Sequence, residues 1–150
     1  MNIDLLREEL MRDEGVMYEI YKDHLGLPTC GIGHLITDLD TEYGMPDGTP
    51  ISKERVEELF ERDVYTTVAE CKLIYHDYDD LPDKVQHIIA NMMINMGRPR
   101  LSRFHKMKKA VDNRDWYEAA YEMTDSKWAK QVPNRAMRLV EEMKSVGEST

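Results

Sequence analysis

The first fifteen residues have the hydrophobic pattern of a short amphipathic helix. Ile3, Leu6 and Leu10 recur at helical spacing, and Asn2 is a suitable N-cap residue. Gly15 follows the last apolar position and can end a helix because glycine accepts a left-handed backbone. The pattern therefore predicts a helix that leaves the residue before Gly15 at its C-terminus.

A strand-rich section follows. Residues 16–22 and 27–35 contain β-branched and aromatic side chains, and they flank Asp23-His24-Leu25-Gly26, a typical hairpin turn. We expect two strands here, with Gly31 and Gly33 allowing close backbone approach. Residues 37–50 are rich in turn-forming residues and predict a surface excursion.

The rest of the chain has helical periodicity. Ser52 is expected to cap a long helix that links the strand-rich section to the remainder. One face of that helix is apolar, with Val56, Leu59, Phe60, Val64, Val68 and Cys71. A second apolar run between Pro82 and Gly97 includes several methionines and predicts a central buried helix, in which core packing is a better reading than an adaptable binding face.

Shorter helices are expected near the C-terminus. They cover about 102–111, 116–123 and 134–144, with Asp115 and Asn134 as caps and a frayed tail at 147–150. The elements together predict an α+β protein, and 150 residues are enough for a single domain with a sizeable core.

Composition limits the classes of function. The net charge is −9, which disfavours binding to nucleic acid, and no segment has the length or apolar character of a signal peptide or a membrane span. Cys30 and Cys71 lie in apolar surroundings, where two reduced thiols are favoured although one disulfide is possible.

Two acids in the N-terminal part have the residue types that glycoside hydrolysis requires. That reaction needs a protonated carboxyl group for the leaving oxygen and an ionised group for water or the forming cation. Glu14 is expected at a helix C-terminus, where the helix dipole disfavours its ionisation, and Asp23 stands nine residues later beside a turn. Spacing alone proves little, because the chain has 29 acidic residues and most such pairs are solvated.

The motifs around these acids are more specific. The chain contains Asp13-Glu14-Gly15, Tyr21-Lys22-Asp23, Thr29 and Gly31-Ile32-Gly33-His34-Leu35 in that order. Further matching positions are Asn91-Met92, Met96-Gly97, Trp116, Glu118-Ala119-Ala120, Ser126, Trp128, Gln131 and Pro133-Asn134-Arg135-Ala136. In these motifs the chain resembles the phage T4-type lysozymes, the glycoside hydrolases of phage endolysins, over nearly its whole length. It departs from them by a shorter segment between His34 and Asp63, a few residues lost before Asp80, and a shorter C-terminus.

The resemblance implies a fold and a reaction. It implies a small β lobe at about 15–51, a linking helix and helical lobe at about 52–150, and a first helix, 1–14, packed on the helical lobe, with a cleft between the lobes. The implied reaction is inverting hydrolysis of the β-1,4 bond between N-acetylmuramic acid and N-acetylglucosamine, with carboxyl groups roughly 6.5–9.5 Å apart and no cofactor or metal. Glu14 would be the acid, and Asp23 and Thr29 would position and activate water.

The resemblance also implies supporting residues. His34 would form an ion pair with Asp63 that ties the lobes, and Arg135 would contact carboxylates that include Glu14. Leu35, Ile94, Asn95 and Phe104 match or align with substrate-binding positions of the cleft. Ile94 and Asn95 differ in residue type from the family, so subsite preferences there are open.

Other readings of the same residues remain. Asp23 could bond only the turn amides, and Thr29 could be present only for its β-branched shape. Glu14, Asp23, His24 and His34 could be drawn as a metal site, although they lack a known ligand spacing. A wall-binding protein that keeps the fold without catalysis is also an alternative.

The expected partner is the glycan strand of peptidoglycan, bound by a monomer without stable membrane association. A lysozyme without a signal peptide would stay in the host cytoplasm until a holin or similar protein opens the inner membrane. The alternative is a tail-associated lysozyme. Because the net charge is −9, we expect lysis to rise from low to moderate salt, unless a basic patch governs approach to the wall. The candidate patch comprises Arg98, Arg100, Arg103, Lys106, Lys108 and Lys109.

Overall fold

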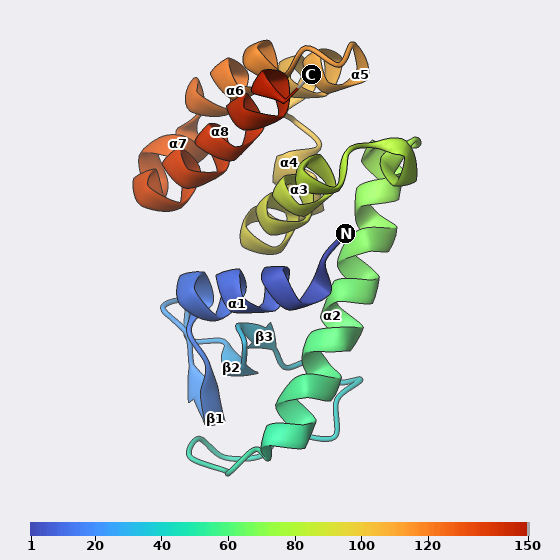
Figure 1. Ribbon diagram of the computed structural model, residues 1–150. Coiled ribbons are helices and arrows are strands. Elements are labelled where there is room, and N and C mark those ends of the chain that lie inside the picture. The colour runs from blue at the N-terminus through green and yellow to red at the C-terminus, as the bar shows by residue number, and fades with distance from the viewer. Residues whose placement is uncertain (150) are drawn as a thin grey trace. The chain divides into compact units, whose positions relative to one another are not determined.

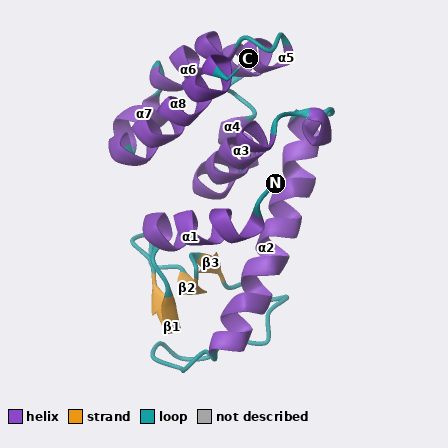
Figure 2. Cartoon of the chain, viewed as in Figure 1, coloured by secondary structure: helices purple, strands orange, loops and turns teal. Residues whose placement is uncertain are grey.

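The computed structural model describes residues 1–149 and has the predicted α+β class (Figure 1). Most elements are helices, and the strands form one small antiparallel sheet in the order β1-β2-β3 (Figure 2). The elements are α1 (Ile3–Glu14), β1 (Met17–Lys22), β2 (Pro28–Gly31), β3 (His34–Leu35), α2 (Lys53–Ile74), a 3-10 turn η1 (Tyr78–Asp80), α3 (Asp83–Met96), α4 (Arg98–Leu101), α5 (His105–Asp112), α6 (Trp116–Thr124), α7 (Lys127–Gln131) and α8 (Pro133–Glu148).

The chain divides into two compact units. One comprises residues 3–66 and is called the β unit; the other comprises residues 1–2 and 67–150 and is called the helical unit. The division falls inside α2, so this long helix begins in the β unit and ends in the helical unit. The lobe boundaries and the packing of the first helix expected from the resemblance stay predictions.

The N-terminal helix and the first hairpin form as their residues predict. Gly15 has a φ of +76° and donates its N–H to the Met11 carbonyl at 2.9 Å, which ends α1 at Glu14. In the hairpin, Gly26 has a φ of +79° and donates to the Asp23 carbonyl at 2.9 Å. Glu14 therefore stands at a helix end and Asp23 at the start of a turn.

The expected single strand at 27–35 is wrong, because two strands occupy this range. β2 and β3 pair antiparallel, with Cys30 opposite His34, and the chain reverses between them. Gly31 and Gly33 have φ values of +62° and +64°, so they supply the left-handed backbone that this reversal needs.

The segment 37–50 is a surface loop, but it is anchored at several points. Its end runs along β1, where the Ile20 N–H donates to the Thr49 carbonyl at 3.0 Å and the Gly48 N–H to the Ile20 carbonyl at 2.7 Å. Asp40 and Glu42 are buried although most of the loop is exposed. Buried carboxylates require hydrogen-bond or ion-pair partners. The partners of Asp40 include a residue of the candidate site, His34.

The apolar face of α2 supplies much of the core of the β unit. Val56, Leu59, Phe60 and Val64 are all buried, and the N–H of Arg55 donates to the hydroxyl of Ser52 at 3.0 Å, which confirms the expected cap. Sheet residues and their neighbours complete this core with Ile20, Cys30, Ile32 and Ile36.

The helical unit has a single core in which α3 is largely buried, as predicted. Met92, Met93 and Met96 belong to this core, so the methionine run packs inside the protein. Figure 1 shows α6, α7 and α8 close together, and α6 packs directly on α8. The predicted cap at Asp115 is confirmed by a hydrogen bond of 3.1 Å from the Glu118 N–H.

Several predictions for this unit are wrong. The helix expected at 102–111 corresponds to α5, which begins only at His105, and the sequence pattern predicts neither α4 nor α7. Asn134 is not a cap, because Pro133 takes the first position of α8 and Val132 is the N-cap residue. The tail is helical to Glu148 instead of frayed from Gly147; Thr150 lies outside the described residues.

Both cysteines are free and buried, as favoured by the sequence. Burial, the largest cause in each case, raises the pKa of Cys30 to about 11 and that of Cys71 to about 12. The two thiols therefore stay protonated and pack as small apolar side chains.

Candidate active site

Glu14 is the last residue of α1 and lies directly against the β2–β3 turn. A Cβ atom placed on Gly33 would lie 3.2 Å from the Cβ atom of Glu14 and 3.5 Å from its Oε2. The absence of a side chain at Gly33 therefore leaves the space that Glu14 occupies. The glycine serves two purposes, since its φ of +64° is also needed for the turn.

Asp23 is fixed by the backbone of its own turn. Its Oδ1 accepts hydrogen bonds from the N–H groups of Leu25 at 2.8 Å and Leu27 at 2.9 Å. The bond from Leu27 is the largest cause that lowers the pKa of Asp23, and further turn amides and the charge of His24 outweigh the opposing effect of desolvation. The turn therefore favours the ionised form, which a general base requires.

Thr29 lies on β2, opposite Tyr21 of β1, and is buried. Its hydroxyl donates to the carbonyl of Leu27 at 2.9 Å, the residue whose N–H binds Asp23. Because the hydroxyl proton is used in this bond, the oxygen can only accept a further hydrogen bond. Thr29 is thus suited to accept a hydrogen bond from a water molecule.

Tyr21 connects the two acids electrostatically, although the sequence does not single it out as a site residue. Burial is the largest cause that raises the pKa of Tyr21, and the negative charges of Glu14 and Asp23 raise it further. Both acids therefore lie close enough to one phenol to act on its ionisation. The sequence offers one sign that Tyr21 belongs near the site, because Tyr21 is part of the Tyr-Lys-Asp motif.

His34 has a carboxylate on each side of its ring. Its Nδ1 lies 2.7 Å from Oδ2 of Asp63, the partner that the resemblance implied, and its Nε2 lies 2.8 Å from Oδ2 of Asp40. Sequence reasoning missed Asp40. In the structure its side chain is only 1% exposed. Both ring nitrogens are engaged, so the metal-ligand reading of His34 has no support in this geometry.

Asp40 joins this pair to two further groups. It accepts the N–H of Thr37 at 3.0 Å and a guanidinium N–H of Arg62 at 3.0 Å. Burial acts to raise the pKa of Asp40 and is the largest single effect, but the hydrogen bonds from Thr37, His34 and Arg62 together lower it. The cluster therefore fixes the loop 37–50 and β3 to α2 within the β unit.

The pH dependence of this cluster has a definite sign. Desolvation acts to lower the pKa of His34, but the hydrogen bonds and charges of Asp63 and Asp40 raise it overall. A raised folded pKa gives stability below the unfolded value of about 6.5 that is lost as pH rises through the folded value. The lowered pKa of Asp40 gives stability that is lost only in acid.

We predict that Asp40→Asn lowers the free energy of unfolding by about 1–3 kcal/mol at mildly acidic pH and by less at a pH above the raised pKa of His34. The asparagine would retain an acceptor oxygen but lose the charge that favours protonated His34. Thermal unfolding at the two pH values measures the difference, and NMR should show a lower pKa of His34. Asp63→Asn, at a side chain 39% exposed, should have a smaller effect on stability. An unchanged His34 titration in both variants would contradict this assignment.

The other predicted residues are distributed over both units. Leu35 lies on β3, opposite Thr29, and is 46% exposed. Ile94 and Asn95 lie on α3 and are partly buried. Asn95 accepts the indole N–H of Trp128 at 2.6 Å, so its amide oxygen is oriented by the core.

Arg135 is buried in the helical unit on α8. Its Nε donates to Oδ1 of Asn91 on α3 at 2.8 Å, which fixes the guanidinium within this unit. The expected interaction with Glu14 stays a prediction.

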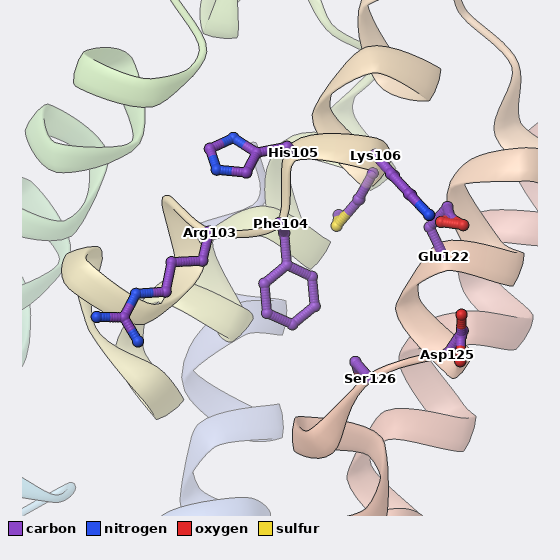
Figure 3. A pocket seen from close by; sticks show the side chains of 8 residues that line it. Arg103, Phe104, His105, Lys106, Glu122, Asp125 and Ser126 are labelled. Carbon is purple, nitrogen blue, oxygen red and sulfur yellow. The ribbon is translucent and has the colours of Figure 1, made fainter.

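Phe104 lines a pocket of about 350 Å³ in the helical unit. Its ring meets that of Trp128 edge to face, with centroids 6.3 Å apart. Figure 3 shows Arg103 and His105 on the side of the pocket away from Glu122 and Asp125, and Lys106 extending in the direction of Glu122 in this view. The lining residues are Arg103, Phe104, His105, Lys106, Met107, Glu122, Asp125 and Ser126.

Comparison with known proteins places these features in a family. A model of the phage lysozyme family matches residues 11–142. Probable T4-type lysozyme 2 of Dictyostelium discoideum is 32% identical to the chain over an alignment of 157 residues, gaps included. The alignment covers 92% of each protein. The pre-baseplate central spike protein Gp5 of Enterobacteria phage T4 is 31% identical over 152 residues, which cover 89% of this chain and 26% of the spike protein.

Together with the α+β fold, these matches define the class of the protein as a lysozyme, a glycosidase that hydrolyses peptidoglycan. The chain belongs to the phage lysozyme family. Among residues 1–149, no helix is both long enough and apolar enough to cross a membrane.

Proposed function

We propose that the protein is a muramidase that cleaves the β-1,4 bond between N-acetylmuramic acid and N-acetylglucosamine with inversion at the anomeric carbon. The observation that carries this proposal is the turn at Asp23. It favours the ionised carboxylate by backbone hydrogen bonds and leaves the Thr29 oxygen as an acceptor for water. An ionised acid and an acceptor hydroxyl are what activation of a water nucleophile requires.

In the proposed reaction, Glu14 donates its proton to the glycosidic oxygen as the bond to the anomeric carbon breaks. A water molecule bound by Asp23 and Thr29 attacks the opposite face of the sugar, and Asp23 takes the proton that the water releases. After hydrolysis Glu14 is ionised and Asp23 is protonated, so Glu14 regains a proton from solvent and Asp23 releases one to it.

We propose that Leu35, Ile94, Asn95 and Phe104 contact the substrate. In support, Leu35 is exposed beside the strand position of Thr29, and Phe104 lines a pocket. His34, Asp63 and Arg135 are proposed to support the site without touching the reacting atoms.

The hydroxyl of Thr29 provides a test of the water-binding role. Thr29→Val keeps the β-branched shape but removes the acceptor, and it should lower kcat by about 10- to 100-fold. Thr29→Ser keeps the oxygen and should retain most of the activity. Turnover on purified peptidoglycan measures both variants, with circular dichroism to verify the fold. Equal activity of Thr29→Val and the parent would show that Thr29 only forms the strand.

The position of the cleaved bond can be determined from the new chain ends. Peptidoglycan digested by the protein is reduced with borohydride, hydrolysed and examined for reduced amino sugars. Reduced N-acetylmuramic acid is the expected product. Reduced N-acetylglucosamine would identify a glucosaminidase, and no new ends would favour the alternative of a non-catalytic wall-binding protein.

We propose host lysis at phage release as the biological role, with a holin or similar protein opening the inner membrane. The likeness to the central spike protein Gp5 favours a second candidate, a lysozyme carried on the phage tail. Mass spectrometry of purified particles would separate these roles, because a tail lysozyme is a constituent of the particle and an endolysin is not.

A further inference from the structure

The charge of the protein is divided unequally between its two units. Residues 3–66 contain 6 Lys and Arg against 16 Asp and Glu, a net charge of −10. The remaining residues contain 14 basic against 13 acidic side chains, a net charge of +1, and the two values add to the total of −9. The helical unit is therefore the part that an anionic surface would repel least.

Within the helical unit, basic residues concentrate between Arg98 and Lys109. This stretch has six Lys and Arg and no acid. Apolar residues recur every third position and are buried or partly buried at Leu101, Phe104, Met107 and Ala110. Basic residues recur one position earlier, at Arg100, Arg103, Lys106 and Lys109, and we name these four the basic row. Because the apolar side of the segment packs inward, all four basic residues are exposed.

Most of the positive charge of the basic row is not neutralised within the protein. Arg100 donates to the neutral amide of Gln131 at 2.6 Å. Among residues 1–149, no ion pair involves Arg103 or Lys109, whereas neighbouring Lys108 is paired with Asp112 at 2.7 Å. Figure 3 shows Arg103 extending away from Glu122 and Asp125.

A row of exposed cations is usually only a solvated face. Two observations favour a binding role here: the row is the main concentration of positive charge in a chain of net charge −9, and it runs beside the pocket that contains Phe104. Arg103 and Lys106 line that pocket, so the charged surface is continuous with a site proposed for substrate.

We propose that the basic row binds carboxylates of the peptide stems of peptidoglycan, so that the enzyme approaches the wall by its helical unit. The inference rests on the proposed peptidoglycan substrate. Peptide stems carry free carboxylates at regular intervals along the glycan, and guanidinium and ammonium groups recognise carboxylates by charge-assisted hydrogen bonds. The acidic β unit would then restrict the orientations in which the protein docks.

The test uses an inactive background so that binding is measured without digestion. Glu14→Gln protein is sedimented with purified peptidoglycan over a salt series from about 0.02 to 0.3 M, where the Debye length falls from tens of ångströms to a few. We expect the affinity to fall steadily as salt rises. The −9 net charge predicts the opposite trend, so an affinity that rises with salt would overturn the proposal.

A matched pair of variants locates the surface. Arg103→Gln with Lys109→Gln should weaken binding by about three- to tenfold at low salt and flatten its salt dependence. Lys53→Gln with Lys127→Gln changes the net charge by the same amount at exposed positions elsewhere and should change binding by less than about twofold. Equal losses in the two variants would overturn the assignment to the basic row.

Chemical modification of the wall identifies the partner group. Amidation of the peptide carboxylates should abolish the difference between the parent and the Arg103 and Lys109 variant. If amidation has no effect but removal of phosphate-containing polymers does, the bound group is a phosphate and the proposal is wrong. The reduced-sugar assay on active protein is independent of this binding, so failure of the proposed function would be seen separately.

Discussion

Replacing Glu14 by glutamine is expected to lower peptidoglycan hydrolysis by about 10²- to 10⁴-fold while the protein stays folded. Glutamine keeps the size and shape that fit against Gly33, but its amide is too weak an acid to transfer a proton to the leaving oxygen. The effect should therefore appear in kcat, because the ground-state contacts of the side chain are largely kept. Hydrolysis of purified peptidoglycan and thermal unfolding measure the two parts of this prediction.

Glu8→Gln is the matched control. Glu8 is an exposed acid of the same helix, and its replacement changes the net charge by the same amount. Its activity should equal that of the parent. If Glu14→Gln stays within a few-fold of the parent, Glu14 is not the acid and the proposed mechanism fails.

Substitutions at Asp23 are expected to separate its structural role from its chemical role. Asp23→Asn retains an oxygen that can accept the N–H groups of Leu25 and Leu27, but it loses the negative charge needed to take a proton. We expect near-parental stability with activity lower by about 10²- to 10⁴-fold. Asp23→Ala should lose the turn contacts as well as the activity.

Asp23→Glu and Asp23→Cys keep an ionisable group near the proposed water and should retain part of the activity. The pKa of Asp23 is lowered, so the base is expected to stay ionised at mildly acidic pH. Asp38→Asn, in the exposed loop 37–50, serves as a control for loss of one carboxylate. Full activity in Asp23→Asn would show that the residue serves only the turn.

Much of the site is predictable from the sequence because it depends on local chemistry. A glycine after an apolar helix positions Glu14, and an aspartate before Gly26 forms the turn that positions Asp23. The caps at Ser52 and Asp115 likewise depend on residues three positions apart. The specific roles come from resemblance, since spacing alone does not distinguish these acids from surface carboxylates.

The features that sequence reasoning misses depend on contacts between distant residues or on small differences between local signals. Asp40 lies in a turn-rich loop, where an acid is ordinarily solvated, and only the folded chain places it against His34. The strand predicted after the hairpin is too long because Gly31 and Gly33 are compatible with close backbone approach as well as with the reversal that the structure has. The five residues of α7 are too few to give a periodic pattern.

The corrected start of α8 has a similar explanation. Asn134 is a good cap by residue type, but Pro133 has the fixed backbone angle that suits the first helical turn. The helix therefore begins earlier than predicted, with Val132 as a cap that makes no side-chain hydrogen bond. This shift does not alter the assignment of Arg135 to α8.

The proposed mechanism is tested most directly by the anomeric configuration of the first product. Proton NMR of a peptidoglycan fragment, recorded immediately after addition of enzyme and before the sugar ring equilibrates, distinguishes the two anomers of the new reducing end. Attack of water from the face opposite the leaving group predicts α-N-acetylmuramic acid from the β-1,4 bond. Initial formation of the β anomer would contradict the roles proposed for Glu14, Asp23 and Thr29.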